Sequence, residues 1–193
     1  MENTNNLNYW NTIKNKKNTK KLTFIHTPKC AGSFVASVLK TLNIRNKGHN
    51  LALKNDGITF TVIRNPVDRF ESLLNYRLNE YKPRFDWPRK LYYVWKDKSV
   101  TLNEIVKKMS DKEILNFKPF RTLCYWSKNI DIFISISNLE EFLKFFGYEV
   151  KLEKFKKVNV SKKTRGKFNE HTKNRISKIY ADDMRLFKRT ILE

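Results

Sequence analysis

Three short apolar runs, separated by segments of helical periodicity, constrain the fold of this chain more than any other feature. The runs are Leu22–His26 (LTFIH), Ile58–Ile63 (ITFTVI) and Asp131–Ile136 (DIFISI), and each has the length of a buried strand. Pro28 and Pro66 follow the first two runs and end them. Strands that alternate with helices predict a three-layer α/β domain, in which helices flank a mainly parallel central sheet.

The segments between these runs carry apolar residues three and four positions apart, as helices do. Helices are therefore expected over residues 33–42, 67–81, 101–109, 111–128 and 172–187. Thr101 and Glu104 have the spacing of a capping box at the start of the third of these helices. Asn138 is expected to cap a further helix that stops at Gly147.

Length and charge bound the organisation of the chain. Its 193 residues favour a single domain over residues 22–193, preceded by a flexible basic segment over residues 1–21. Forty Lys and Arg against nineteen Asp and Glu give a net charge of +21. Such a charge favours anionic partners: nucleic acid, nucleotide phosphates, sulfated sugars or a membrane surface. A composition crowded with Lys and Asn explains much of the excess equally well.

Cysteine usage and hydropathy point to a soluble, cytoplasmic protein. Cys30 and Cys124 cannot form a disulfide framework, and no Cys/His spacing suggests a zinc site. No apolar run approaches the ~20 residues of a membrane span. The first residues lack the apolar stretch of a signal peptide.

The segment Leu22–Leu42 places a short loop, TPKCAGS, between an expected strand and an expected helix. Backbone N–H groups in the first turn of a helix lack intrahelical partners, and the helix dipole adds positive potential there. Lys29 adds a mobile cation, so the loop is expected to cradle a phosphate. Lys29 precedes Gly32, and GxxxxGK[ST] is absent, which disfavours a nucleotide kinase with a Walker A loop. The alternative interpretation is a structural strand-to-helix turn.

A second polar constellation follows the next strand. Arg64 stands at the carboxyl end of Ile58–Ile63, where open α/β sheets bind ligands. A strand-end Arg and a hydroxyl on the next helix, here Ser72, can hold a second phosphate. The alternative is a salt-bridge cluster of Arg64, Asp68 and Arg69 that secures the turn, and for Asp68 and Arg69 we prefer it.

Together the segments FIHTPKCAGSF and VIRNPVDRFESLLNY resemble the sulfotransferases that use 3′-phosphoadenosine 5′-phosphosulfate (PAPS). The first is similar to that family's 5′-phosphosulfate loop, and the second to its 3′-phosphate motif, an Arg followed eight residues later by a Ser (72 − 64 = 8). Similarity is greatest to the branch of carbohydrate sulfotransferases and spans roughly residues 22–188. The resemblance implies a P-loop-NTPase-like domain and PAPS as the sulfuryl donor, without a metal.

The resemblance also implies a role for each matching residue. Lys29 would contact the phosphosulfate and the leaving phosphate oxygen, and Arg64 and Ser72 would bind the 3′-phosphate. Backbone groups of the loop, with the Ser33 hydroxyl, would cradle the 5′-phosphate. The loop residues concerned are Cys30, Ala31, Gly32, Ser33 and Phe34. Cys30 departs from the Thr or Ala commonly found in the family, and we expect it to be tolerated rather than catalytic.

Two later segments extend the resemblance. The basic stretch 158–167 falls where the family places a loop that closes over the nucleotide, with Ser161, Lys163 and Thr164 as candidate contacts. A solvated charge run is the alternative for most of its lysines. The closing Tyr180–Asp183 is similar to the Y-x-x-D helix of the carbohydrate branch.

A sulfotransferase also needs a base to accept the proton of the acceptor hydroxyl. We predict that His49 is this base, because the resembling enzymes place a His or Glu between the two phosphate motifs. His26 is expected to point into the sheet, and His171 to face solvent at a helix start. Asp56 and His26 are the fallback bases, and a solvated loop histidine is the alternative interpretation of His49.

The acceptor is expected to be a hydroxyl, on a carbohydrate and possibly an acidic one, which would suit the charge. The aromatic and cationic segment 82–98 either stacks sugar rings or forms a packed aromatic patch. Two other classes remain open: a basic nucleic-acid-binding protein and an inactive relative that binds an anionic glycan. The first lacks every helix-turn-helix, RRM or zinc-finger signature, so no specific nucleic acid is expected. Retention of Lys29, Arg64 and Ser72 argues against the second.

Overall fold

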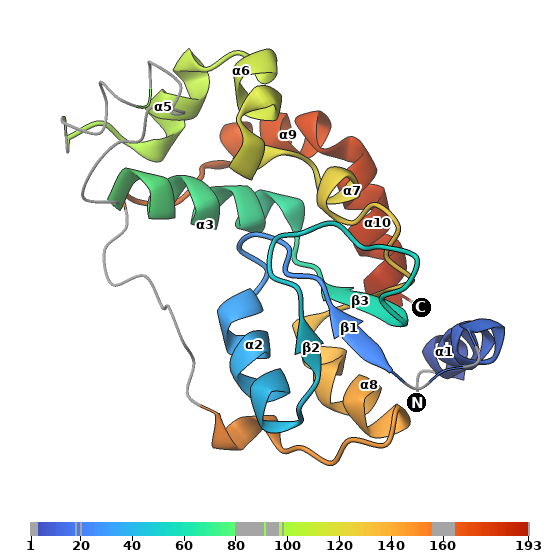
Figure 1. Ribbon diagram of the computed structural model, residues 1–193. Helices are drawn as coiled ribbons and strands as arrows, with labels where there is room; N and C mark the ends of the chain where they lie inside the picture. The colour runs from blue at the N-terminus through green and yellow to red at the C-terminus, as the bar shows by residue number, and fades with distance from the viewer. Residues whose placement is uncertain are drawn as a thin grey trace. The chain divides into compact units, whose positions relative to one another are not determined.

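The computed structural model of the chain describes residues 4–17, 19, 21–79, 91, 97, 99–155 and 165–192. Within these residues the fold is α/β, with a four-stranded all-parallel sheet in the order β2-β1-β3-β4 (Figure 1). The strands are β1 (Leu22–Phe24), β2 (Arg45–Asn46), β3 (Ile58–Val62) and β4 (Ile132–Ile134). The prediction of an α/β fold with a parallel sheet is confirmed.

The helices in the same part of the chain bear the labels of Figure 1. They are α1 (Thr4–Lys17), α2 (Gly32–Thr41), α3 (Pro66–Asn79), α5 (Leu102–Lys108), α6 (Asp111–Asn116), α7 (Leu123–Trp126), α8 (Leu139–Phe145), α9 (Glu170–Ile179) and α10 (Ala181–Leu192). Short 3-10 turns are η1 (Lys118–Phe120), η2 (Ile136–Asn138) and η3 (Leu152–Lys154). None of these helices has both the length and the apolar character needed to cross a membrane.

The chain divides into two compact units. The sheet unit comprises Met1–Arg64, Leu123–Asn159 and Arg185–Glu193. The helical unit comprises Asn65–Thr122 and Val160–Met184. The expectation of a single domain over residues 22–193 stays a prediction.

In the sheet unit, alternate strand residues face opposite sides of the sheet. One face is apolar and packs on side chains of α1, α2 and α8 in one continuous core. The strand residues of this core are Leu22, Phe24, Ile58, Phe60, Val62, Ile132 and Ile134. The register keeps them aligned, because Phe24 pairs with Phe60 and Phe60 pairs with Ile132.

The opposite face of the sheet carries buried threonines whose hydroxyls all find partners. Thr23 donates to the Asp56 carbonyl oxygen at 2.5 Å, and Thr61 donates to the Ile25 carbonyl oxygen at 2.7 Å. Thr61 also meets Thr27, 2.9 Å away between hydroxyl oxygens, which ties β3 to the segment after β1. A smaller apolar cluster covers this side and is formed by Cys30, Ile63 and Leu123, with Phe133, Leu186 and Phe187 packed against it.

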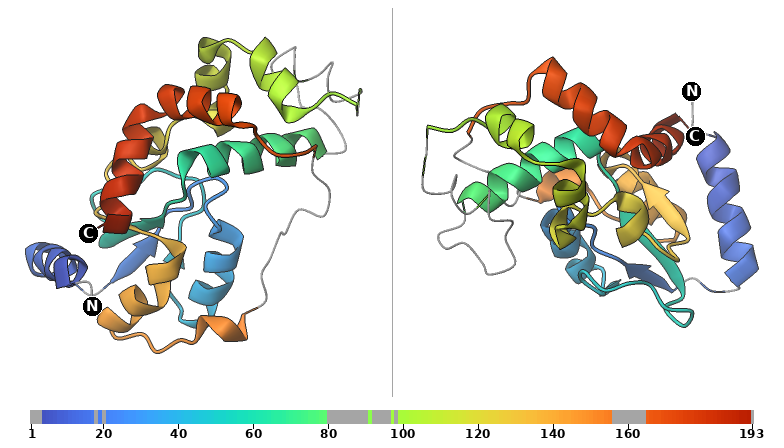
Figure 2. Two further views of the ribbon diagram at one scale, coloured as in Figure 1. Left: turned by 180° about the vertical axis from the view of Figure 1, so that it is seen from behind. Right: turned by 90° about the horizontal axis from the view of Figure 1, so that it is seen from above.

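Helix α1 differs from the flexible lead-in expected for residues 1–21. Trp10 is fully buried, and its ring meets Phe142 and Phe145 of α8 at centroid distances of 5.3 and 5.6 Å. Lys17 forms an ion pair with Asp131 at 2.9 Å. The segment is polar enough to look unstructured, but a single tryptophan docks it, and Figure 2 shows α1 beside the sheet.

The helical unit is built on α3, α5, α6 and α9. Both α5 and α6 begin with capping boxes, the predicted one at Thr101–Glu104 and an unpredicted one at Ser110–Glu113. Residues 111–128, expected as one helix, form α6, η1 and α7 instead. The closing helix is likewise divided at Tyr180, whose buried hydroxyl donates to the Phe120 carbonyl oxygen at 2.5 Å.

The ends of helix α8 agree in part with the expectations, and one strand was not predicted. Asn138 occupies the N-cap position of α8, but its side chain caps no N–H and accepts from the hydroxyl of Ser135 at 2.9 Å instead. Gly147, with φ of 87°, follows α8 as predicted. Strand β2 escaped prediction because its two residues are exposed and polar.

Candidate functional site

The sheet reverses its direction of growth between β1 and β3. From β1 the chain crosses to β2 on one side, and from β3 it continues to β4 on the other. The connections that leave the carboxyl ends of these two adjacent strands therefore lead to opposite sides of the sheet. Open α/β sheets bind ligands at such a point. The loop with Lys29 follows β1, and Arg64 follows β3, so both fall at this switch point of the sheet unit.

The loop after β1 has an unusual backbone for its residue types. Lys29 and Ala31 have φ of 61° and 57°, in the left-handed region that side chains other than glycine rarely adopt. Each such residue costs roughly 1–2 kcal/mol. Ala31 is the N-cap of α2 and offers no capping side chain. Left-handed residues beside the N–H groups of a first helical turn are a backbone arrangement that can bind an anion, so this loop is a candidate anion site.

Gly32, the first residue of α2, is required by a close approach of His26. A Cβ added to Gly32 would lie 1.8 Å from Nε2 and Cδ2 of the His26 imidazole. His26 therefore lies against the start of α2, and its half-buried ring also stacks on the core residue Phe24 at 6.1 Å, so it lies at the edge of the sheet core. The imidazole becomes part of the wall of the loop.

His49 lies directly beside His26. The two ring centroids are 4.1 Å apart, and His49 Nδ1 is 2.6 Å from the His26 carbonyl oxygen. A carbonyl oxygen only accepts hydrogen bonds, so this contact assigns the proton to Nδ1 of His49. In the neutral ring the lone pair then lies on Nε2, and the exposed His49 side chain presents a nitrogen that can accept a proton.

The protonation of His26 differs from that of an ordinary histidine. Burial, followed by the nearby His49 and Lys29, lowers the pKa of His26 from 6.5 to about 4. His26 is therefore neutral at physiological pH. A neutral ring beside Lys29 adds no second positive charge to repel the lysine.

The other loop residues take distinct positions. Lys29 and Phe34 are half-buried, Ser33 and Ala31 are exposed, and Cys30 is buried with 1% of its surface exposed. Cys30 packs with Ile63 and Leu123, so its thiol serves the apolar cluster under the loop.

Arg64 is exposed and makes no hydrogen bond or ion pair within the part of the chain that the structure describes. Ser72 is half-buried on α3 and belongs to the helical unit, so its pairing with Arg64 stays a prediction. Asn65 caps α3 through Oδ1, which accepts from the Val67 N–H at 2.9 Å.

Arg69 is buried and donates to the Pro119 carbonyl oxygen at 3.3 Å. In the same unit Arg69 and Asp183 both act electrostatically on Tyr180, and burial raises the pKa of that phenol. The Tyr180–Asp183 pair of the closing motif is therefore buried inside the helical unit, which supports a structural role for these residues.

The remaining candidate bases differ in availability. Asp56 is buried, and the pKa of its carboxyl is lowered, chiefly by a hydrogen bond from Lys47. His171 is exposed in the first turn of α9, as expected, and belongs to the helical unit.

Two aromatic residues of α7, which no sequence motif indicates, also lie at the site. The ring of Trp126 on α7 is 6.1 Å from that of His49, and Tyr125 packs edge-on against Trp126 at 5.3 Å. No spacing in the sequence relates α7 to the two phosphate motifs.

Several predicted residues lie outside the described residues. These are Ser161, Lys163 and Thr164 of the basic stretch, and Trp87, Tyr92, Tyr93 and Trp95 of the aromatic segment.

Comparison of the chain with protein-family models, with curated proteins and with solved structures found no match. In the described ranges no three His, Cys, Asp or Glu side chains are grouped so that they could hold a metal ion.

Proposed function

We propose that the chain is a sulfotransferase that moves the sulfuryl group of PAPS to a hydroxyl acceptor. One observation carries the proposal: a left-handed, lysine-bearing loop at the switch point of the sheet, with an oriented imidazole beside it. The loop is suited to a phosphate group, and the imidazole to removal of a proton. The proposal includes a three-layer, P-loop-NTPase-like α/β domain. The adjacent carboxyl ends of β1 and β3 are consistent with such a domain.

Sulfuryl transfer needs charge stabilisation on one side of the sulfur and proton removal on the other. An acceptor hydroxyl oxygen attacks the sulfur while the bond from sulfur to the 5′-phosphate oxygen breaks, and its electron pair stays on that oxygen. Lys29 and the N–H groups at the start of α2 stabilise the negative charge where it develops. His49 Nε2 receives the proton of the hydroxyl.

The nucleotide-binding residues follow from the resemblance and are part of the same proposal. The loop from Lys29 to Phe34 would hold the 5′-phosphosulfate, and Arg64 with Ser72 would hold the 3′-phosphate. An exposed Arg64 at a strand end supports its part of this assignment. The late basic stretch, with Ser161, Lys163 and Thr164, would close over the nucleotide.

The acceptor that we propose is a carbohydrate hydroxyl, and an acidic carbohydrate would be favoured by the net charge of +21. Tyr125, which is exposed and packs on the buried Trp126 next to His49, gives the sheet unit an aromatic surface. Aromatic rings of this kind can stack on the apolar face of a sugar.

The test is mass spectrometry of neutral and acidic oligosaccharides incubated with PAPS and the protein. Addition of one SO₃ to an acceptor is the expected result. The His49→Gln variant should lower the rate by about 10²–10⁴ and leave binding of adenosine 3′,5′-bisphosphate unchanged. Transfer by this variant at the wild-type rate would exclude His49 as the base. The proposal would be overturned if the wild-type protein showed no sulfuryl transfer and no binding of the bisphosphate.

A further inference from the structure

We infer that Asp56 is a positioning residue for His49, holding the loop that carries this imidazole in the orientation that proton removal requires. The inference rests on the proposed function of His49, and it concerns contacts inside the sheet unit alone. Asp56 touches neither the sulfuryl donor nor the acceptor in this scheme. It acts through the segment from Arg45 to Leu53.

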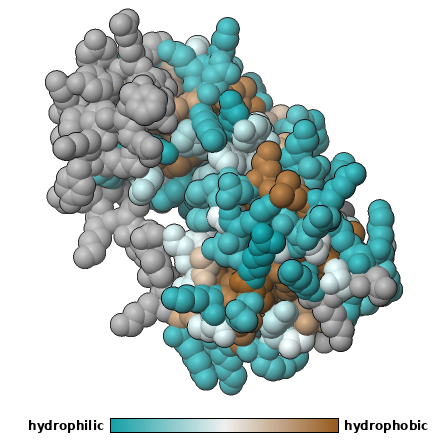
Figure 3. All heavy atoms as spheres, viewed as in Figure 1, coloured by the Kyte–Doolittle hydropathy of each residue, from teal (hydrophilic) through white to brown (hydrophobic). Residues whose placement is uncertain are grey.

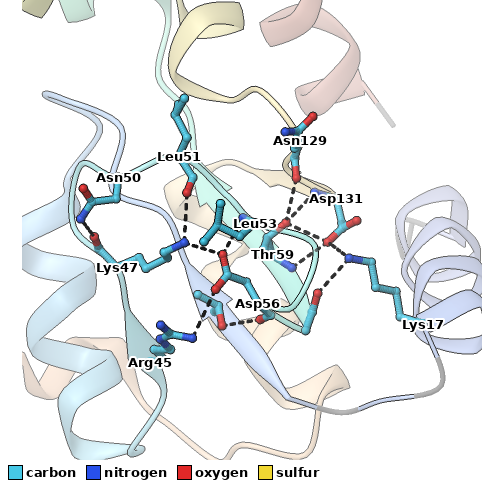
Figure 4. A network of polar contacts seen from close by, with 12 residues as sticks. Lys17, Arg45, Lys47, Asn50, Leu51, Leu53, Asp56, Thr59, Asn129 and Asp131 are labelled. Carbon is cyan, nitrogen blue, oxygen red and sulfur yellow. Dashed lines mark hydrogen bonds and ion pairs between the residues drawn. The ribbon is translucent and has the colours of Figure 1, made fainter.

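Asp56 is buried, with 3% of its surface exposed, and its carboxylate accepts three hydrogen bonds from this segment (Figure 4). Oδ2 accepts from Lys47 Nζ at 2.7 Å and from the Leu53 backbone N–H at 2.6 Å. Oδ1 accepts from Arg45 Nη1 at 3.2 Å. The donors come from before and after His49, so the carboxylate joins the two sides of its loop.

Lys47 makes two further hydrogen bonds within the same loop. Its ammonium also donates to the Leu51 carbonyl oxygen at 3.1 Å, and its own carbonyl accepts from Asn50 Nδ2 at 2.7 Å. Residues 47 and 51 are therefore linked by one ammonium group, and His49 lies midway between them. Only 13% of the Lys47 side chain is exposed, which keeps this ion pair largely out of solvent.

The clamped loop is tied to the end of β1. The Lys47 N–H donates to the Phe24 carbonyl oxygen at 3.0 Å, and the His26 N–H donates to the Gly48 carbonyl oxygen at 2.8 Å. These bonds bring His49 Nδ1 to the His26 carbonyl oxygen. The tautomer that places the lone pair on Nε2 thus depends on a loop whose shape Asp56 fixes.

Charge is needed at Asp56 because its partners include two cations, Lys47 and Arg45. An amide could still accept one N–H, but it would leave the Lys47 ammonium without its counter-ion. Removing one partner of a largely buried ion pair is more disruptive than removing both. The loop would then rearrange, and His49 would lose its fixed contact with His26.

The experiment compares Asp56→Asn with a matched control, Asp131→Asn. Asp131 is also a carboxylate at the sheet, but among the described residues its carboxylate binds Thr59 and Lys17 and accepts no hydrogen bond from the loop of His49. The readout is the nitrogen-15 NMR spectrum of the His49 imidazole in the free protein, which reports the ratio of its two neutral tautomers. The Asp56–Lys47 contacts are called the clamp of this loop. Lys47→Met serves as a second clamp variant, because it removes the same ion pair and keeps the aliphatic part of the side chain.

The Nδ1–H tautomer should dominate in the wild-type protein and in Asp131→Asn. Asp56→Asn and Lys47→Met should both shift the ratio away from Nδ1–H, and both should lower the rate of sulfuryl transfer about 10- to 100-fold without weakening bisphosphate binding. An unchanged tautomer ratio in folded clamp variants would overturn the inference. A changed ratio in a protein that transfers no sulfuryl group would support the clamp and refute the proposed function, so the two failures are distinguishable.

Discussion

At the scale of single residues, the site pairs one cation with a histidine that carries no charge. Lys29 stands in a left-handed backbone conformation at the head of the loop, and His26 lies against Gly32 at the start of α2. Because the pKa of His26 is lowered to about 4, the positive charge at this point comes from Lys29 and the helix N-terminus. An anion bound here would meet that charge directly.

Replacement of Lys29 by Ala is expected to affect turnover more than nucleotide binding. In the proposed mechanism the ammonium stabilises charge that develops in the transition state, so turnover should fall by about 10²–10³. Affinity for adenosine 3′,5′-bisphosphate should fall by about tenfold or less. Steady-state kinetics and calorimetry check the two effects. Lys40→Ala, an exposed site in the last turn of α2, is the control and should change neither. Near-normal turnover of Lys29→Ala would contradict the mechanism.

The lowered pKa of His26 makes the stability of the protein depend on pH. The folded protein keeps His26 neutral to about pH 4, whereas the unfolded chain protonates it near 6.5. Between these values the unfolded state binds more protons, so the contribution is fully present above pH 6.5 and is lost as the pH falls toward 4.

Urea unfolding of His26→Gln at pH 7 and at pH 4.5 tests this dependence. The free energy of unfolding of the wild-type protein should fall more than that of the variant over this range. His171→Gln, at an exposed position of α9, should follow the wild-type protein. A difference between wild type and His26→Gln that stays constant with pH would show that His26 titrates normally.

The sequence marked Lys29, Gly32 and Arg64 as site residues because they match the two resembling motifs, and His49 because it lies between those motifs. The structure brings the first, second and fourth close to one another in the sheet unit. The sequence could not show that His26 lies against α2 or that Trp126 lies near His49, because both contacts arise from tertiary packing. Asp56 was considered only as a base, since its cationic partners come from a loop with no predictable register.

At the scale of elements, docking by one large side chain decides whether a polar segment folds onto the sheet. Helix α1 has little amphipathic pattern, yet Trp10 is completely buried against α8. Most helical stability in proteins comes from such tertiary packing rather than from propensity. This explains why the composition of residues 1–21 suggested a flexible lead-in.

Trp10→Ala should lower the free energy of unfolding by about 3–5 kcal/mol, because it removes a fully buried aromatic side chain. Denaturant titration measures the loss. Asn11→Ala, exposed on the same helix, should change stability by less than about 0.5 kcal/mol. A change below about 1 kcal/mol for Trp10→Ala would mean that α1 does not pack on α8 in solution.

Local signals predicted some helix starts and missed others for identifiable reasons. The capping box at Thr101–Glu104 has both its partners within four residues, so the sequence alone reveals it. The closing helix is divided at Tyr180, whose hydroxyl donates to the carbonyl oxygen of Phe120, sixty positions away, and no local pattern shows this contact. Strand β2 forms by pairing Arg45 with Thr23 rather than by an apolar run.

At the scale of the whole molecule, the α/β class followed from the alternation of apolar runs and helical segments. The parallel pairing of β1 with β3 followed less directly, since it depends on a long return through residues 47–57. A net charge of +21 was also evident from the start. Hydrophilic side chains cover much of the described surface in Figure 3, between smaller apolar patches. A high positive charge is compatible with a nucleic acid and with a nucleotide as the ligand. Only the proposed nucleotide site requires Arg64 to bind a 3′-phosphate.

Calorimetric titration with adenosine 3′,5′-bisphosphate and with AMP tests the proposed nucleotide site most directly. The two ligands share adenosine and the 5′-phosphate, and they differ in the 3′-phosphate assigned to Arg64 and Ser72. Each charge-assisted hydrogen bond contributes about 1.5–3 kcal/mol, so the bisphosphate should bind at least about tenfold more tightly. Arg64→Ala should remove most of this preference. Equal affinity of the wild-type protein for the two nucleotides would contradict the account.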